Sequence, residues 1–396
     1  MSRVNAIRSM GKADYHYPVV VIGGGPCGLA AALGILNQEL GVAVIEKTDY
    51  NQKRIGEHLP PSALGIFAEL GIPDHLVERN HLPCAGVMSW WGHQAPVHTV
   101  DYYFHPMQHG INLSRPRFDR DLADFVRQRG ATIHERTTIH SIHRHGGLWH
   151  IELSTNGQER IMTTPFVIDA SGKSASFART QGSRILAGNP QVAIIRYGSI
   201  NQAPAQDHKN HIVIESCPTG WWYFAPLAAG QAVAMFMTDV DVTPLHKSTL
   251  LTHWDVALQS TNHIADRLQP YVHLQKPVVC LSRSQRLDCF QGENWLAAGD
   301  AAMTFDPLSS HGISKGLRHG WMAGKAVATF TQQGDRRALE RFDRDLEYIF
   351  SEYLKTRTGY YATEQRWPES RFWSRRHATD PLSGQFDIAS TFRQVV

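Results

Sequence analysis

Residues 19–28 constrain the fold most, because an apolar run passes there into a glycine-rich turn and then into a second apolar run. The first run is typical of a buried strand, and residues 29–33 continue as a helix. Between them, Gly23, Gly25 and Gly28 have G-x-G-x-x-G spacing, which permits a tight turn, close approach of the backbone to a pyrophosphate, and close helix packing. We therefore predict a dinucleotide site at this turn.

A second apolar strand, over residues 42–45, ends in the acid Glu46, eighteen residues beyond Gly28. An acid near this position accepts hydrogen bonds from ribose hydroxyls. The same site is predicted to include Cys27, Lys47 and Arg54. The pattern fits FAD as well as NAD(P), so the rest of the chain has to decide between them.

The composition is that of a soluble globular protein, since 42% of the 396 residues are hydrophobic and 19% are charged. A formal net charge of +3, without a run of Lys or Arg, predicts no nucleic-acid partner. The five scattered cysteines form no C-x-x-C pair, which indicates a reducing compartment. No apolar run approaches the ~20 residues of a membrane span, and residues 1–16 form a polar lead-in without a secretory core. We expect a cytoplasmic protein.

The chain contains 22 histidines, several of them close together in residues 140–145. That segment alternates as an exposed hairpin does, so we interpret its histidines as solvated side chains and not as ligands. No metal site is predicted.

Helical and extended patterns follow one another along the chain, which indicates an α/β fold. A helix is predicted over residues 62–71, with Ser62 as its N-cap, and another ends near Gly130. Short alternating segments at 132–135, 148–154 and 160–163 predict a small antiparallel meander. The other expectations are strands at 85–91 and 165–172, aromatic-rich strands with a helical excursion over 192–286, and helices over 312–330 and 336–354.

Three motifs, in this order along the chain, resemble those of FAD-dependent monooxygenases of the aromatic hydroxylase superfamily. The glycine turn with Glu46 is similar to the ADP-binding part, and Arg115 in Arg-x-x-Phe-Asp is similar to the arginine that lies against the cofactor. Gly299 and Asp300 resemble the late Gly-Asp motif that holds the ribityl chain and pyrophosphate. The resemblance extends that part of the site to Pro307, Gly312 and Ile313. It implies FAD as the cofactor.

The resemblance also implies a Rossmann-like FAD-binding domain of the aromatic hydroxylase and glutathione reductase type, interleaved with a mixed-sheet substrate domain. The FAD-binding domain is expected over residues 15–190 and 287–335, with an inserted β-meander and part of the substrate wall near 80–110. The substrate domain is expected over 191–286, and a helical, Trp-rich tail over 336–396.

Within that superfamily, three further segments resemble the branch of flavin-dependent halogenases and halogenase-like proteins. They are Gly56-Glu57, residues 169–172 and Gly220-Trp221-x-Tyr223-x-Ala225-Pro226. The halogenase pattern Trp-x-Trp-x-Ile-Pro has Tyr223 for its second Trp and Ala225 for its Ile. Halogenases also carry a lysine that holds the halogenating oxidant, whereas this chain has none between Lys53 and Lys173. We therefore expect hydroxylation of an electron-rich aromatic ring and not halogenation.

Two features bear on partners. Ser171 stands where NAD(P)H-using hydroxylases of this superfamily have an acid before the glycine, so we expect a separate flavin reductase or a different reductant. The tail at 360–376 is similar to the tails of halogenase-like flavoproteins that mature tryptophylquinone cofactors in amine or amino-acid oxidases. This similarity implies a tryptophan of a partner polypeptide as the substrate, with a free small aromatic molecule as the other candidate.

Candidate catalytic residues are those able to transfer a proton beside the flavin. They are Ser310 and His311 near Pro307, and Glu57 and His58 on the opposite wall. The substrate cavity is expected to be shaped by Trp221, Trp222 and Tyr223. The alternatives are a flavin-dependent dehydrogenase or reductase of a small molecule and a flavoprotein chaperone of a quinoprotein precursor.

Overall fold

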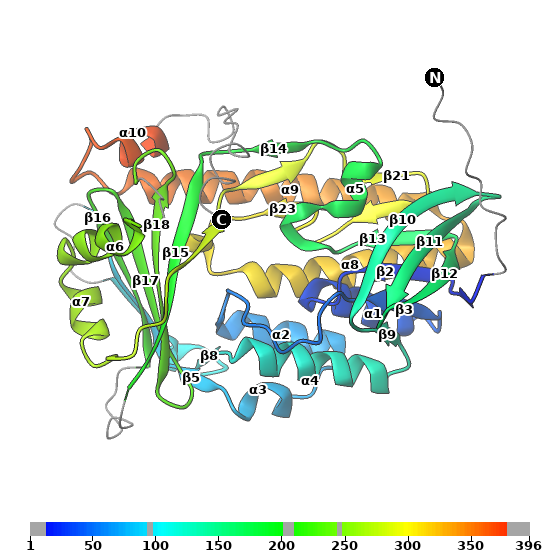
Figure 1. Ribbon diagram of the computed structural model, residues 1–396, viewed down its shortest axis with the longest axis horizontal. Helices are drawn as coiled ribbons and strands as arrows, with labels where there is room; N and C mark the ends of the chain where they lie inside the picture. The colour runs from blue at the N-terminus through cyan, green and yellow to red at the C-terminus, as the bar shows by residue number, and fades with distance from the viewer. Residues whose placement is uncertain (1–12, 93–97, 201–209, 244–247, 378–396) are drawn as a thin grey trace.

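The computed structural model describes residues 13–92, 98–200, 210–243 and 248–377. Figure 1 shows a parallel sheet with a meander at one end of an elongated molecule and a second large sheet at the other. Two long helices, α8 (Gly312–Gln333) and α9 (Arg336–Ala362), run between the two ends. None of the helices in these ranges has the length and apolar character that a membrane crossing requires.

A six-stranded sheet forms the first part, in the order β21-β22-β13-β2-β3-β9. All neighbours are parallel except the edge strand β21, and the three central strands β13, β2 and β3 are buried along their whole length. Strands covered on both faces read as continuous apolar runs, which is why the sequence indicated them. The strands are β2 (Val19–Ile22), β3 (Val42–Ile45), β9 (Thr132–His134), β13 (Phe166–Asp169), β21 (Gln291–Gly292) and β22 (Trp295–Ala297).

Helix α1 (Pro26–Leu36) follows the glycine turn and crosses α8 in direct backbone contact. A Cβ on Gly320 would lie 2.0 Å from the carbonyl oxygen of Cys27, and one on Gly324 would lie 2.2 Å from that of Ala31. Only glycine fits at these two positions of α8. The crossing holds the N-terminal ends of both helices close together.

The meander consists of β10 (Thr137–His145), β11 (Leu148–Thr155) and β12 (Gln158–Thr164), with β1 (Tyr15–His16) added in parallel to β12. The predicted hairpin around residues 140–145 is confirmed. The prediction that residues 132–135 belong to the meander is wrong, because β9 pairs with β3 at the edge of the parallel sheet. The chain enters β9 from α4 (Arg115–Gln128), so this strand completes a β-α-β crossover.

The second large sheet has seven strands in the order β19-β15-β18-β17-β16-β6-β7. All neighbouring pairs are antiparallel except β16 and β6. Its strands are β6 (Gly86–Trp90), β7 (His98–Asp101), β15 (Gln191–Ser199), β16 (His211–Cys217), β17 (Gly220–Leu227), β18 (Gln231–Asp239) and β19 (Val278–Leu281). The segment near 80–110 thus adds two strands to the unit proposed over 191–286. The domain boundaries stay a proposal.

Smaller elements connect these layers. Two three-stranded sheets are formed by β4 (His58–Leu59), β8 (Gly110–Asn112) and β5 (Leu82–Cys84), and by β14 (Ile185–Ala187), β20 (Gln285–Leu287) and β23 (Met303–Thr304). The remaining helices are α2 (Pro61–Leu70), α3 (His75–Glu78), α5 (Ser176–Thr180), α6 (Leu250–Gln259), α7 (His263–Leu268) and α10 (Arg371–His377), with 3-10 turns η1 (Tyr102–Phe104), η2 (Gly172–Ser174) and η3 (Pro307–Ser309).

Two predicted helix ends differ from the structure, and the two predicted chain ends lie partly beyond it. Helix α2 begins at Pro61 with Pro60 as its N-cap, and not with Ser62 as the cap, because proline is preorganised for the first helical position. Helix α9 continues to Ala362, beyond the predicted end at 354. Residues 1–12 of the predicted lead-in at 1–16 lie outside the described residues. So do residues 378–396 of the predicted tail at 336–396.

Candidate functional site

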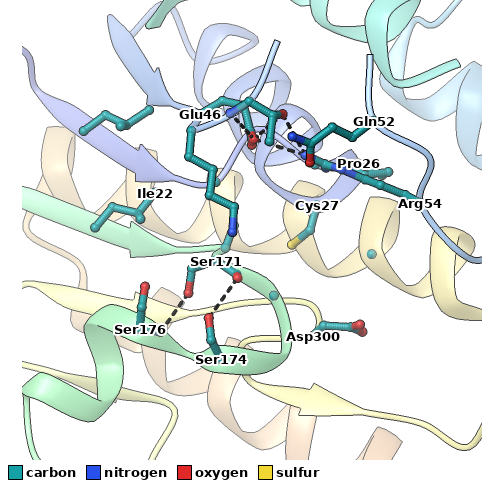
Figure 2. A pocket seen from close by; sticks show the side chains of 18 of the residues that line it. Ile22, Pro26, Cys27, Glu46, Gln52, Arg54, Ser171, Ser174, Ser176 and Asp300 are labelled. Atoms are coloured by element: carbon teal, nitrogen blue, oxygen red, sulfur yellow. Dashed lines mark hydrogen bonds and ion pairs between the residues drawn. The ribbon is translucent and has the colours of Figure 1, made fainter. Parts of the chain in front are cut away.

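A cavity of about 730 Å³ opens where the first glycine turn, the ends of β3 and β13 and the start of α8 meet. Figure 2 shows Glu46, Gln52 and Arg54 on one side of it and Ser171, Ser174, Ser176 and Asp300 on the other, with Cys27 between them. The predicted cofactor residues that line it are Gly23, Gly25, Cys27, Glu46, Lys47, Arg54, Arg115, Asp300, Gly312 and Ile313. Gly28, Gly299 and Pro307 do not line it.

The glycine turn has the form that a bound pyrophosphate needs. Gly23 has φ +106°, and a Cβ there would lie 2.3 Å from the carbonyl oxygen of Ala170. A Cβ on Gly28 would lie 1.8 Å from the carbonyl oxygen of Gly23, so Gly28 permits the tight turn without lining the cavity. At Gly25 the nearest atom would be Nη1 of Arg54, at 3.5 Å, so the backbone here is open to the cavity. Helix α1 has no side-chain cap, which leaves its first N–H groups open to an anion.

Glu46 is buried and held as an acceptor at the end of β3. Its carboxylate accepts from the backbone N–H of Gly24 at 2.8 Å, from the hydroxyl of Thr48 at 2.6 Å, and from Nη2 of Arg54 at 3.0 Å. Burial alone would raise the pKa of Glu46, but the Thr48 hydrogen bond and the charge of Arg54 hold it below its usual value. An ionised acid facing the cavity fits the predicted contact with ribose hydroxyls. Thr48 and Gln52 also line the cavity and were not predicted.

Asp300 lies on the other side of the cavity, paired with a residue that the sequence analysis missed. Nζ of Lys315, in the first turns of α8, is 2.7 Å from Oδ1 of Asp300 and 2.6 Å from the carbonyl oxygen of Met303. Burial favours the neutral acid, but the Lys315 ammonium holds the pKa of Asp300 below its usual value. The position of Lys315 between the apolar residues Ile313 and Leu317, on the buried side of α8, could have indicated a buried ion pair. Gly299, beside Asp300, packs against Cys27 of the first turn, where its Cβ would lie 2.7 Å from the sulfur.

Arg115 fixes the cavity wall formed by Ile55 and Gly56. Its guanidinium donates to the carbonyl oxygens of both residues and forms a bidentate pair with Asp119, at 3.2 Å and 3.0 Å. It lines the cavity while its donors are engaged by the protein. These contacts support a role for Arg115 in holding the cavity wall. Its predicted place beside the cofactor stays a proposal.

Ser171, which occupies the position of the expected acid, also lines the cavity. Asp169, two residues earlier, accepts from the backbone N–H groups of Ser171 at 2.9 Å, Phe177 at 3.0 Å and Ala178 at 2.8 Å. Asp169 thus closes the turn after β13 and caps α5.

The predicted acid–base residues Glu57 and His58 lie together behind the cavity wall, and both are buried. Oε1 of Glu57 accepts from the hydroxyl of Tyr197 at 2.7 Å, and burial raises the pKa of this acid. The ring of His58 lies between Oδ1 of Asn112 at 3.2 Å and the hydroxyl of Tyr102 at 3.1 Å. Tyr102 and Tyr197 extend the group of proton-carrying side chains and were not predicted.

Ser310 and His311 lie in the turn just before α8. Ser310 has φ +52° and is partly buried, whereas His311 is exposed and its ring contacts the carbonyl oxygen of Ser309. Burial lowers the pKa of His58, and a charge on His311 adds to this effect. Neither Ser310 nor His311 lines the cavity, and their catalytic assignment stays a prediction.

The three aromatic residues predicted to shape the substrate cavity do not share one face of β17, because successive residues of a strand point to opposite faces. Trp222 packs against Phe236 and Trp254, with ring centroids 5.0 Å and 4.6 Å away. This corrects the prediction for Trp222, which is core beneath α6. Trp221 and Tyr223 belong to the buried cluster on the other face and do not line the described cavity, so their place in the substrate cavity stays a prediction.

We expect the free energy of unfolding to fall as the pH drops from 6.5 towards 4. Burial lowers the pKa of His58 from 6.5 to about 4, so in this range the unfolded chain takes up a proton that the native state refuses. The loss is about 1.4 kcal/mol per pH unit for one such group. Chemical denaturation at a series of pH values should show a shallower slope in His58→Gln than in the native protein. The exposed His140→Gln serves as control, and an equal slope in His58→Gln and the native protein would contradict the assignment.

The chain matches the family described as FAD binding domain over residues 16–354. LodB of Marinomonas mediterranea, described as an FAD-dependent oxidoreductase, is 30% identical over 370 residues, which cover 92% of this chain and 98% of LodB. The flavin-dependent halogenase CmlS superposes with a TM-score of 0.81 at 22% identity, over 96% of this chain and 70% of CmlS. The peptidyl tryptophan dihydroxylase QhpG superposes with a TM-score of 0.77 at 22% identity, over 94% of this chain and 81% of QhpG.

The predicted cofactor, the resemblance to halogenase-like flavoproteins and the Rossmann-like fold class are thereby confirmed. The residues of the cavity also fit the cofactor, because open helix N–H groups and cavity-facing Glu46 and Asp300 lie at its opposite sides. The chain belongs to the FAD binding domain family and is an FAD-dependent oxidoreductase with the fold of flavin-dependent halogenases.

Proposed function

We propose that the protein is a monooxygenase that hydroxylates an electron-rich aromatic ring, and that this ring is a tryptophan of a partner polypeptide during tryptophylquinone formation. QhpG is described as a peptidyl tryptophan dihydroxylase essential for tryptophylquinone cofactor biogenesis, and this chain has the same fold. Since the identity is 22%, the fold alone does not decide the reaction. The chemistry of the groups behind the cavity supports the choice.

The observation that carries the proposal is the set of side chains around Glu57. It contains a carboxyl group, an imidazole and phenols: Glu57, His58, Tyr102, Tyr197 and Tyr223. The ammonium of Lys53 lies 4.6 Å from the centre of the Tyr197 ring, but Lys53 precedes the segment in which halogenases carry their lysine. Halogenation needs an ammonium to hold the halogenating oxidant, and the chain has no lysine between Lys53 and Lys173. Hydroxylation needs groups that hold and move protons, and these are present.

Bound reduced FAD would supply an electrophilic oxygen derived from O₂. The protein has to keep water away, place the ring and manage the proton that the ring carbon loses. Glu57 is 2% exposed, and the hydroxyl of Tyr197 donates to it, so this carboxyl can receive the proton out of contact with water. Tyr223 and Trp221, on the face of β17 away from α6, would support the ring.

Electrons are proposed to come from a separate flavin reductase or a different reductant, because Ser171 replaces the acid found in NAD(P)H-using hydroxylases. Rapid stoichiometric reduction of the purified protein by NADH or NADPH alone would contradict this.

The test is mass spectrometry of a tryptophan-containing precursor polypeptide after incubation with the chemically reduced holoenzyme and ¹⁸O₂. We expect the precursor to gain one or two labelled oxygens on tryptophan, and a precursor with Phe at that position to gain none. Glu57→Gln should slow the gain by about 100-fold, as expected for loss of an acid–base group. Glu69→Gln, an exposed acid on α2, should leave the rate unchanged.

Each of the other outcomes supports another function. A stable complex with the precursor without oxygen incorporation would favour the chaperone. Oxidation or reduction of a small molecule, again without incorporation, would favour a dehydrogenase or reductase. Labelled oxygen on a free small aromatic molecule but not on the precursor would keep the monooxygenase and overturn the peptidyl substrate.

A further inference from the structure

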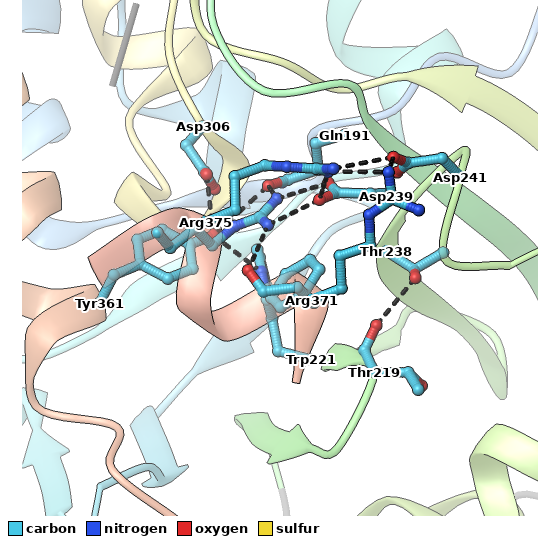
Figure 3. A network of polar contacts seen from close by, with 12 residues as sticks. Gln191, Thr219, Trp221, Thr238, Asp239, Asp241, Asp306, Tyr361, Arg371 and Arg375 are labelled. Atoms are coloured by element: carbon cyan, nitrogen blue, oxygen red, sulfur yellow. Dashed lines mark hydrogen bonds and ion pairs between the residues drawn. The ribbon is translucent and has the colours of Figure 1, made fainter. Parts of the chain in front are cut away.

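Tyr361, near the end of α9, joins two parts of the molecule through one hydroxyl group. The side chain is 0% exposed. Its hydroxyl donates to Oδ2 of Asp306 at 2.8 Å and accepts from the indole N–H of Trp221 at 3.0 Å. Figure 3 shows Tyr361 at the left of the network, with Asp306 above it and Trp221 of β17 below and to its right. A phenol has one proton, so the donor and acceptor roles of Tyr361 are both used.

Asp306 anchors the turn that leads into α8. Its Oδ1 accepts from the backbone N–H of Leu308 at 3.0 Å and so closes η3. Three further contacts come from α9: Tyr361, Nε of Arg357 at 3.3 Å, and the hydroxyl of Tyr353, 2.7 Å from the Asp306 backbone nitrogen. Helix α9 therefore determines where residues 307–311 lie, and these residues lead directly into Gly312 of the FAD cavity.

The far side of Tyr361 is fixed by α10. Arg376 is fully buried and forms a bidentate ion pair with Asp239 of β18, at 2.7 Å and 2.9 Å. The same guanidinium donates to Oε1 of Gln191 in β15 at 2.7 Å and lies 5.3 Å from the centre of the Tyr361 ring. The buried Tyr361 ring is therefore held in place independently of the turn at residues 307–311. Tyr361 is held by the substrate sheet, and it holds the turn beside the FAD cavity.

We propose that Tyr361 is a positioning residue for the flavin reaction. Its bond to Asp306 sets the turn 307–311 and the start of α8 against the cofactor, and its bond to Trp221 fixes that turn relative to the substrate sheet. The inference deepens the proposed function and rests on FAD occupying the described cavity. It does not depend on the identity of the substrate.

The test measures FAD binding and the environment of the bound flavin. Tyr361→Phe keeps the ring and removes the hydroxyl, and Asp306→Asn keeps the shape and removes the charge. We expect each to raise the FAD dissociation constant by about tenfold, the scale of one charge-assisted hydrogen bond, and to change the visible circular dichroism of bound FAD. Because both variants remove the Tyr361–Asp306 bond, the loss of affinity in the double variant should be smaller than the sum of the two single losses.

Two further variants separate positioning from stability. Tyr360→Phe alters the exposed neighbour, and we expect the dissociation constant and the flavin spectrum to be unchanged. Trp221→Phe leaves the Tyr361–Asp306 bond in place, so FAD affinity should stay within about twofold of the native value. Unchanged affinity and dichroism in Tyr361→Phe, with only a lower unfolding temperature, would overturn the proposal, and so would additive losses in the double variant. Failure of tryptophan hydroxylation would leave these FAD measurements unaffected.

Discussion

Replacement of Lys315 by methionine is expected to lower the free energy of unfolding of the FAD-free protein by about 3 kcal/mol. Lys315 is 6% exposed, and its ammonium is the cation that faces Asp300 at 2.7 Å. Methionine fills a similar volume but leaves a carboxylate without its partner. Because Asp300 borders the cavity, the loss should fall at the lower end for a broken buried ion pair. Urea denaturation of the FAD-free variant measures it.

The same substitution should raise the FAD dissociation constant by about tenfold or more. Without the ammonium, burial raises the pKa of Asp300 against only the weaker charges of Lys173 and His319, and the protonated acid loses its strength as an acceptor for ribityl hydroxyls. Adding Asp300→Asn should restore part of the stability, since no unpaired charge remains, but not the FAD affinity. Lys325→Met, at an exposed site on the same helix, is the control. Equal losses in both lysine variants would show that the Asp300 pair has no special role.

Local patterns predicted the part of the site that is formed within short stretches of chain. The strand, turn and helix around Gly23 are encoded by apolar runs and glycine spacing, and Glu46 follows because it ends the next buried strand. Residues 132–135 show where local sequence patterns do not predict the fold. They alternate as meander strands do, but β9 pairs with β3, because α4, which leads into β9, packs against β9 and α1.

Pairings between distant segments could not be predicted. Lys315 reaches Asp300 only because α8 folds back over the Gly-Asp turn, and Tyr197 reaches Glu57 across 140 positions of sequence. The aromatic run in β17 indicated a buried strand, but only the flanking layers show that Trp222 belongs to the core and Trp221 to the tail side. The end of α9 was placed too early because Thr356, Thr358 and Gly359 are poor helix formers, and these last turns are held by tertiary contacts such as Tyr361 with Asp306.

Replacement of Asp239 by alanine is expected to release α10 from the substrate sheet. Asp239 is fully buried and forms ion pairs with both Arg375 and Arg376. Its removal leaves the Arg376 guanidinium buried without a counter-ion, which costs about 3–5 kcal/mol where the native packing is kept. A short helix near the end of the described chain can avoid that cost by detaching, so the observed loss is limited by the free energy of local opening. Hydrogen exchange over residues 371–377 should therefore become fast before the rest of the protein unfolds.

The neighbouring acid Asp241 supplies a matched control for this prediction. It also contacts Arg375, at 2.8 Å, and Arg371, at 2.9 Å, but its side chain is 27% exposed. Water can solvate the partners of Asp241 when it is removed, so Asp241→Ala should cost about 1 kcal/mol or less and leave exchange at 371–377 slow. Similar effects of the two substitutions would mean that the number of ion pairs, and not the burial of Asp239, determines how firmly α10 is bound. A large effect confined to Asp239→Ala, accompanied by weaker FAD binding, would connect the tail to the cofactor site through Arg376 and Tyr361.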